Sequence, residues 1–305
     1  MKKIAITTTS FGEYDKTVLE PLAERGCEVV FNPYGRKLKK EEISDLYCDV
    51  IGIIAGTETI DDEVMGRLPR LRVISRCGTG MDNVDLEAAK RKGIKVFNTP
   101  DAPTLAVAEL TIGLMLDMLR RITMTDREIR SGVWHKHMGN LINGKSVGIV
   151  GFGRIGRKVA ELLIPFGCAI RYYDIIAGTS ETEIIGAHID RLEMDSLLRI
   201  SDIVTIHVSS QEQVLGRNEI GKIKRGAWLV NVSRGGVVDE EALYEALKND
   251  HLSGAALDVF MEEPYKGPFT ELKNVLLTAH IGSYAKESRI EMERQSVMNL
   301  LKGLE

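Results

Sequence analysis

Cysteine is scarce in this sequence, which has four cysteines among 305 residues. No two of them have the CxxC spacing that is typical of zinc sites and redox-active pairs. A disulfide framework and a cysteine-bound metal are therefore not supported, and so few scattered thiols suit a reducing cytoplasm, where we expect the protein. The four are Cys27, Cys48, Cys77 and Cys168.

Long apolar runs and an excess of positive charge are also missing. The longest apolar stretch, residues 105–119, contains Glu109 and Asp117 and is shorter than the ~20 residues that a helix needs to cross a bilayer. The first ten residues, MKKIAITTTS, hold too short an apolar run for a signal peptide. The net charge of −4 provides no basic surface for nucleic acid. We therefore expect neither a membrane nor a nucleic acid as a partner.

What is present is the composition of an ordinary globular protein, with 44% apolar and 28% charged residues. The length is sufficient for two domains. Up to about Asn98, short apolar runs alternate with helical patterns, which predicts parallel strands covered by helices. The predicted strands are Ile4–Thr7, Val29–Phe31, Val50–Ile54, Arg72–Ser75 and Ile94–Phe97.

The most informative stretch is residues 146–174, in which an apolar run leads into glycines, a helical pattern and a second strand. Gly151, Gly153 and Gly156 form a G-x-G-x-x-G pattern directly after the run 147–150. In a dinucleotide site the first glycine permits a tight turn, the second admits the pyrophosphate, and the third allows close packing of helix and strand. Asp174 lies where a carboxylate accepts hydrogen bonds from the adenosine ribose. The stretch predicts a Rossmann unit that binds NAD.

Two segments indicate how the chain is divided. Residues 99–103, TPDAP, break the alternating pattern and predict a crossing between domains. The helix that follows, from about Thr104 to Leu119, is apolar nearly all round, so we expect it to be buried at a surface between domains or subunits. Further strands are predicted at Ile203–His207, Ala227–Val232, Gly254–Asp258 and Val275–Ala279.

Three reactive side chains follow the ends of three of these strands. Arg234, Glu263 and His280 should converge, because the carboxyl ends of parallel strands share one edge of a sheet. Taken singly, each also fits a structural role: a loop residue, a turn acid and a core histidine. Together they fit hydride transfer at C2 of a 2-hydroxy acid, since arginine holds a carboxylate with two parallel donors and histidine exchanges a proton near neutral pH. A carboxylate beside the histidine orients the ring and favours imidazolium.

These motifs resemble the D-2-hydroxyacid dehydrogenase family, and its phosphoglycerate dehydrogenase branch most closely, across essentially the whole chain. The resemblance implies that Arg234, Glu263 and His280 are catalytic. It also implies a substrate loop around Gly78, Thr79 and Gly80, and a nicotinamide contact from Asp258. The matching stretches are residues 75–100, 107–113, 144–160, 201–208, 230–243, 254–264 and 278–283. Further cofactor contacts implied by the resemblance are Arg154, Ile155, Val208, Val232 and Gly282.

The architecture implied by the resemblance is α/β, with two doubly wound parallel-sheet domains. A Rossmann NAD domain, residues 99–282, is expected to be inserted in a flavodoxin-like substrate domain made of residues 1–98 and 283–305. Family members are usually homodimers joined through the NAD domain, which suits the apolar helix after Thr104. The sequence ends at Glu305 without the regulatory domain of longer phosphoglycerate dehydrogenases, so feedback by serine is not expected.

The substrate stays open at this stage. Arg76 matches an arginine that phosphoglycerate dehydrogenases use, which favours a phosphorylated substrate and serine biosynthesis, although Arg76 also fits a solvated strand-end residue. Glu58 lies where related enzymes often carry another arginine, and we expect it to repel a phosphate. Reduction of glyoxylate or hydroxypyruvate is the alternative. A non-catalytic NAD-sensing scaffold is the alternative from another class.

Two histidine-containing segments have local interpretations. The chain reads His207-Val-Ser-Ser-Gln where the family commonly has HVPLT, and we interpret His207 as packing or loop support rather than as a second base. His135 and His137 lie in a loop next to Trp134. Because no third ligand or cysteine is near them in the sequence, we interpret them as loop contacts and expect no metal site.

Overall fold

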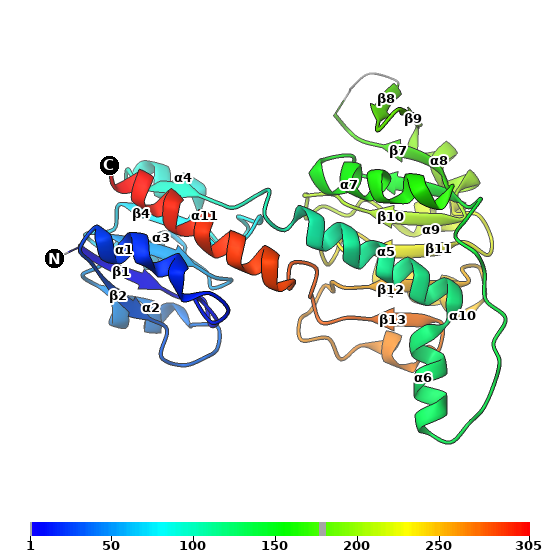
Figure 1. Cartoon of the computed structure of the whole chain (residues 1–305), viewed down its shortest axis with the longest axis horizontal. Coiled ribbons are helices and arrows are strands. Elements are labelled where there is room, and N and C mark those ends of the chain that lie inside the picture. Colours follow the sequence, from blue (N-terminus) through cyan, green and yellow to red (C-terminus); the bar gives the residue numbers. More distant parts are fainter. Residues whose placement is uncertain (1, 177–180) are drawn as a thin grey trace. The chain divides into compact units, whose positions relative to one another are not determined.

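The computed structural model describes residues 2–176 and 181–305, and it divides into two compact units (Figure 1). Unit 1 is Met1–Pro103 with Tyr284–Glu305, and unit 2 is Thr104–Ser283. The first boundary lies five residues beyond the predicted one, because the crossing segment 99–103 belongs to unit 1 and the next helix begins at Thr104. No helix among the described residues is both long and apolar enough to cross a membrane.

Unit 1 is built on a parallel sheet of five strands in the order β2-β1-β3-β4-β5, which is the flavodoxin-like arrangement. Its strands are β1 (Lys2–Ile6), β2 (Cys27–Phe31), β3 (Gly52–Ala55), β4 (Val73–Arg76) and β5 (Lys95–Phe97). Its helices are η1 (Lys16–Leu19), α1 (Glu20–Glu24), α2 (Lys40–Tyr47), α3 (Asp62–Gly66), α4 (Leu86–Arg91) and α11 (Lys286–Leu304).

The inner strands β1, β3 and β4 are buried on both faces of this sheet, which explains why they read as apolar runs, whereas the outer strands β2 and β5 contain no buried residue. Ile54 and Val73 face α1 and α11, whereas their neighbours Ile53 and Ile74 face α2, α3 and α4. The last helix of the chain, α11, therefore completes the core of the first unit, as the resemblance implies.

Unit 2 is built on a sheet of eight strands in the order β13-β12-β11-β10-β6-β7-β9-β8. Its strands are β6 (Ser146–Val150), β7 (Ala169–Tyr173), β8 (Glu181–Ile184), β9 (Ala187–Arg191), β10 (Ile203–Ile206), β11 (Trp228–Asn231), β12 (Gly254–Leu257) and β13 (Val275–Leu277). Its helices are α5 (Thr104–Arg120), α6 (Ile122–Arg130), α7 (Arg154–Leu163), η2 (Ile164–Phe166), α8 (Met194–Ile200), α9 (Arg217–Lys222), α10 (Glu240–Lys248) and η3 (Pro268–Glu271).

One edge of this sheet departs from the predicted parallel order. Strands β8 and β9 pair antiparallel, with Ile184 opposite Ala187, so Ile185 and Gly186 form a two-residue turn. Both turn residues have positive φ, 49° and 73°. Such hairpin turns usually carry Asn-Gly or Asp-Gly, and the isoleucine in this turn is the reason that the sequence pattern did not reveal the hairpin.

One face of helix α5 is buried against other elements of unit 2. Its apolar residues Val107, Ile112 and Met115 join one core with Val159 and Leu163 of α7 and with strands of the same sheet. The buried face of α5 is therefore covered inside unit 2, whereas Leu105 is 49% exposed, and a contact of α5 with a second domain or subunit stays a prediction. Helices α8, α9 and α10 belong to the core on the opposite face of the sheet.

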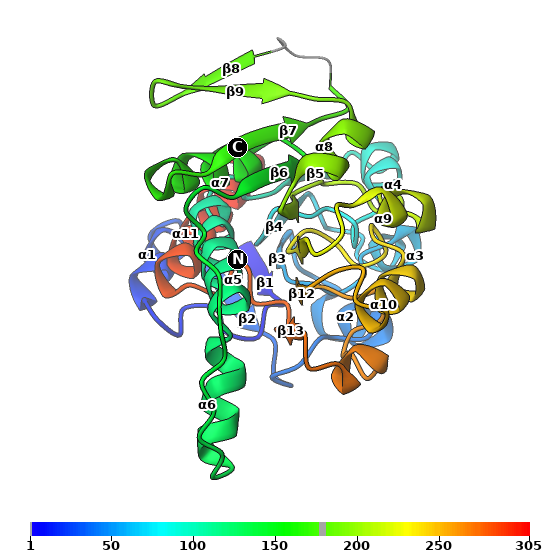
Figure 2. The ribbon, with the colours of Figure 1, turned by 90° about the vertical axis from the view of Figure 1, so that its right-hand side faces the viewer.

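Helix α6 is the exception in this unit. None of its residues is buried, and it extends away from the sheet together with the segment that follows it (Figure 2). It begins after Arg121, whose left-handed backbone (φ 55°) redirects the chain at the end of α5.

Candidate active site

The glycine-rich turn between β6 and α7 has the geometry of a dinucleotide-binding loop. Gly151 has φ +90°, and a Cβ there would lie 2.7 Å from the carbonyl oxygen of His207. A Cβ at Gly156 would lie 2.2 Å from the carbonyl oxygen of Gly151. By contrast, a Cβ at Gly153 would meet nothing within 4 Å, so open space faces the start of α7. Two glycines are thus needed by the fold, and the third borders a space that a ligand could occupy.

Asp174 is anchored at the end of β7 beside this turn. Its carboxylate accepts hydrogen bonds from the backbone N–H of Phe152 (2.6 Å) and of Ile176 (2.9 Å). Phe152 also stacks on Tyr172, with ring centroids 3.9 Å apart. The carboxylate is therefore fixed in position next to the glycine loop, where the sequence predicts the ribose contact.

The other predicted cofactor residues lie along the same edge of the sheet. Arg154 and Ile155 open α7 directly after Gly153. Val208 and Val232 each follow the end of a central strand, β10 and β11, and the 207–208 peptide packs against the Gly151 turn.

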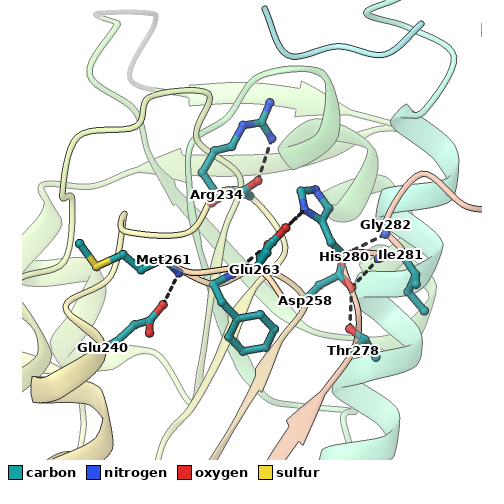
Figure 3. Close-up of polar contacts among 11 residues, drawn as sticks. Arg234, Glu240, Asp258, Met261, Glu263, Thr278, His280, Ile281 and Gly282 are labelled. Carbon is teal, nitrogen blue, oxygen red and sulfur yellow. Dashed lines mark hydrogen bonds and ion pairs between the residues drawn. The ribbon is translucent and has the colours of Figure 1, made fainter. Parts of the chain in front are cut away.

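The predicted contact between His280 and Glu263 is present, and its acid–base role stays a prediction. Nδ1 of His280 lies 2.9 Å from Oε2 and 3.2 Å from Oε1 of Glu263 (Figure 3). Glu263 also accepts a hydrogen bond from the backbone N–H of Phe260 at 3.2 Å, which holds the carboxylate in place. The side chains of His280 and Glu263 are 51% and 38% exposed. With Nδ1 engaged, Nε2 is the ring nitrogen that can reach a ligand.

Arg234 is brought to this pair by contact between two loops. A Cβ at Gly235 would lie 1.9 Å from the carbonyl oxygen of Phe260, so the turn that carries Arg234 touches the loop that carries Glu263. Nη1 of Arg234 donates to the carbonyl oxygen of Ser233 at 2.8 Å, and the guanidinium extends from its turn as Figure 3 shows. The three residues therefore lie beyond the carboxyl ends of β11, β12 and β13, as predicted, and their shared catalytic role stays a prediction.

Asp258 has a structural task that sequence reasoning did not show. It is 1% exposed, and its carboxylate accepts hydrogen bonds from the hydroxyl of Thr278 (2.6 Å) and the backbone N–H groups of Ile281 and Gly282 (both 2.8 Å). The backbone N–H of His280 donates to the carbonyl oxygen of Asp258. His280 itself has left-handed backbone (φ 54°). Asp258 thus holds the turn that presents the histidine, and its nicotinamide contact stays a prediction.

His207 is packed inside the sheet, as expected. Its Nε2 lies 2.9 Å from the hydroxyl of Thr205, and the ring is buried. Burial lowers the pKa of His207 to about 3, so the side chain is neutral in the folded protein and is not a second base.

The predicted substrate loop lies in unit 1, after β4. Gly78 has φ +147°, and a Cβ there would lie 2.6 Å from Nη1 of Arg76, so the guanidinium packs over the loop. Thr99 closes the loop, since its hydroxyl accepts from the N–H of Gly78 and its own N–H donates to the carbonyl oxygen of Gly78. The carbonyl oxygen of Thr79 accepts from Asn98, and Gly80 follows at the partly exposed end of the loop.

Glu58 does not face a ligand, so the expected repulsion of a phosphate is wrong as a local contact. The residue is 1% exposed, and its carboxylate accepts hydrogen bonds from the hydroxyl of Thr7 and from the N–H of Gly56 (2.9 Å). Asn83 then joins this loop to Arg76, because its amide nitrogen donates to the carbonyl oxygens of Gly56 and Glu58, and its Oδ1 accepts from Nε of Arg76. Sequence reasoning missed Asn83, whose only signal is its place directly after the glycine loop.

Comparison with known proteins decides the family. A model described as D-isomer specific 2-hydroxyacid dehydrogenase, NAD binding domain, matches residues 112–282. The chain belongs to this family. It is therefore an NAD-dependent oxidoreductase of the class that acts on CH–OH groups, as the sequence predicts.

Named relatives of the dehydrogenase fall into two groups. A glyoxylate reductase of Thermofilum pendens is 41% identical over 256 residues, which are 80% of this chain and 75% of the relative. A D-3-phosphoglycerate dehydrogenase of Homo sapiens is 38% identical over 275 residues, which are 88% of this chain and 51% of the relative. The chain thus spans about half the length of that phosphoglycerate dehydrogenase.

Solved structures resemble the whole chain. A protein of Thermus thermophilus superposes with a TM-score of 0.91 at 36% identity, covering 99% of this chain and 96% of the other. A glyoxylate reductase of Paecilomyes thermophila has a TM-score of 0.85 at 29% identity, covering 100% and 96%. The predicted fold class is confirmed.

Proposed function

We propose that this dehydrogenase interconverts a small 2-keto acid and its D-2-hydroxy acid, and that Arg234, Glu263 and His280 carry the reaction. The observation that supports this most is the 2.9 Å contact between His280 and Glu263. The loop that carries Glu263 is in turn contacted by the turn that carries Arg234. Bound NADH supplies the hydride. Nε2 of His280 gives its proton to the C2 oxygen, Glu263 stabilises the imidazolium, and Arg234 binds the carboxylate and polarises the C2 oxygen.

We propose that NAD binds at the glycine-rich turn between β6 and α7 and along the adjoining carboxyl edge of the sheet of unit 2. The open space at Gly153 suits a pyrophosphate facing the start of α7, and the anchored Asp174 suits a ribose. The contacts that we propose for the rest of the dinucleotide are Gly151, Arg154, Ile155, Gly156, Val208, Val232, Asp258 and Gly282.

For the substrate, we propose that the Gly78–Gly80 loop binds its carboxylate through the backbone N–H groups of Thr79 and Gly80, since that of Gly78 is bonded to Thr99, and that Arg76 binds a phosphate at the other end of the substrate. 3-Phosphohydroxypyruvate is then the first candidate, in serine biosynthesis. Arg76 supports it because the guanidinium is held on the loop by Asn83, and because the one acid expected to oppose a phosphate, Glu58, is turned inward. A planar guanidinium suits a phosphate oxygen pair.

Glyoxylate or hydroxypyruvate reduction is the second candidate. It is favoured by the identity to the glyoxylate reductase and by the absence of a second arginine in the loop 55–60. The test is kcat/KM with NADH for 3-phosphohydroxypyruvate and hydroxypyruvate. We expect kcat/KM to be at least about tenfold higher for the phosphorylated acid, which is the effect of one charged contact. Arg76→Ala should remove this preference, whereas the control Arg72→Ala, at an exposed position, should keep it. Preference for the unphosphorylated acid would make Arg76 structural and the enzyme a small keto-acid reductase.

We further propose that unit 1 is the substrate domain, that unit 2 is the NAD domain, and that the protein is a cytoplasmic homodimer joined through unit 2. All four cysteines are free, which fits a reducing compartment. The support for a dimer is a set of exposed apolar side chains on α6 and the segment after it, which a second copy would cover. These are Ile122, Ile129, Val133, Trp134, Met138 and Leu141.

A further inference from the structure

A cluster of three metal-ligating side chains lies at the end of α6, away from the catalytic residues. One donor atom each from Glu128, His135 and His137 lies within 4.8 Å of the other two. Nε2 of His137 is 2.7 Å from Oε2 of Glu128, and the two imidazole rings lie 4.2 Å apart between centroids. This is the one such group among the described residues, and the catalytic pair at His280 is not part of it.

The local fold supplies the third ligand that the sequence did not show. Helix α6 ends at Arg130, and Gly132 has φ +83°, which turns the chain back on the helix. The N–H of Val133 then donates to the carbonyl oxygen of Glu128 at 2.9 Å. The segment therefore returns past Glu128, where His137 contacts the carboxylate and a ring nitrogen of His135 lies within 4.8 Å of the other two donor atoms.

We propose that Glu128, His135 and His137 form a Zn²⁺ site with three protein ligands. Two imidazoles and one carboxylate are ligands that zinc accepts in a tetrahedral arrangement, at Zn–N distances of about 2.0–2.1 Å. Tetrahedral ligands at that distance are roughly 3.3 Å apart. The one separation that is known, 2.7 Å between His137 and Glu128, is shorter than this value, and the other two are at most 4.8 Å. Closing the site around an ion therefore requires the side chains to rotate.

In a single chain, the surroundings leave an entry path to the site. The side chains of His137 and Glu128 are only 14% and 29% exposed, whereas His135 faces solvent. A bound ion would tie residues 135–137 to the last turn of α6. It would do so without touching the catalytic residues, so zinc would act on the stability of this segment and not on the chemistry.

The test is zinc titration of the full-length, untagged protein after treatment with chelator, followed by isothermal calorimetry. We expect one Zn²⁺ per chain, at least tenfold weaker binding in Glu128→Gln, and no binding at this site in the double variant His135→Ala/His137→Ala. The exposed His188→Ala is the matched control and should bind as the wild type does. Cobalt substitution should give the visible bands of a tetrahedral site in the wild type and this control, and not in the double variant.

Three results would overturn the proposal: no zinc bound by the wild type, equal binding by the double variant, or zinc that is lost only in His280→Ala. NADH binding serves as the check that each variant is folded, because the glycine loop lies in the same unit. Glu128→Gln keeps the size and shape of the side chain, so it tests the site even where the histidine variants fold poorly.

Discussion

At the residue scale, Arg234 is the side chain on which the proposed chemistry depends most. Arg234→Lys should lose roughly a hundredfold or more in kcat/KM, about 3 kcal/mol, because a point charge cannot make the two parallel bonds to carboxylate and C2 oxygen. NADH affinity should stay unchanged. The exposed Arg225→Lys, in the same unit, is the control for a general effect of the substitution. Activity of Arg234→Lys within threefold of the wild type would remove Arg234 from the mechanism.

His207 makes a prediction about stability. Burial lowers its pKa from 6.5 to about 3. Below pH 6.5 the imidazole is therefore protonated in the unfolded chain but stays neutral in the folded chain. The contribution of His207 to the free energy of unfolding is thus fully present above pH 6.5. It decreases toward pH 3, with a loss of about 2 kcal/mol at pH 5. His207→Gln should be less sensitive to acid between pH 7 and 5. Urea unfolding followed by tryptophan fluorescence reports it, since Trp134 and Trp228 both lie in unit 2. Identical pH dependence in the variant and wild type would refute the assignment.

At the scale of elements, the glycine turn between β6 and α7 separates a folding role from a binding role. Gly156→Ala places a Cβ 2.2 Å from a carbonyl oxygen and should lower the unfolding midpoint of unit 2. Gly153→Ala meets no protein atom and should leave that midpoint nearly unchanged while weakening NADH at least tenfold, since its methyl group enters the space assigned to the pyrophosphate. The two variants are controls for each other. Tight NADH binding by Gly153→Ala would place the pyrophosphate elsewhere.

Elements and sites differ in how far the sequence predicts them. Strands buried on both faces read as apolar runs, and catalytic residues at their ends follow from parallel topology, so Arg234, Glu263 and His280 could be brought together in advance. The hairpin β8–β9 could not, because Ile185 occupies a left-handed turn position. The inward orientation of Glu58 depends on Thr7, fifty-one residues away, and so does not show in a local pattern. Glu128 approaches His137 only through the turn at Gly132.

At the scale of the whole molecule, the exposed apolar residues of α6 predict that two copies of the chain form a dimer through this helix. Ile122 and Ile129 are 56% and 49% exposed, on a helix with no buried residue. If a second copy covers them, Ile122→Glu/Ile129→Glu should shift the protein from dimer to monomer in light scattering at micromolar concentration. Glutamates at the exposed Arg67 and Arg70 of unit 1 are the control pair and should leave the dimer intact. A monomeric wild type would end the dimer proposal.

The proposed activity of the whole enzyme is tested most directly by NADH oxidation with a panel of small 2-keto acids, with and without a phosphate. We expect that NADH is consumed only when a 2-keto acid is present, that the product is the D-2-hydroxy acid, and that His280→Ala abolishes turnover while NADH still binds. NADH that binds tightly but is oxidised by no 2-keto acid in the panel, or an L-hydroxy acid as product, would contradict it.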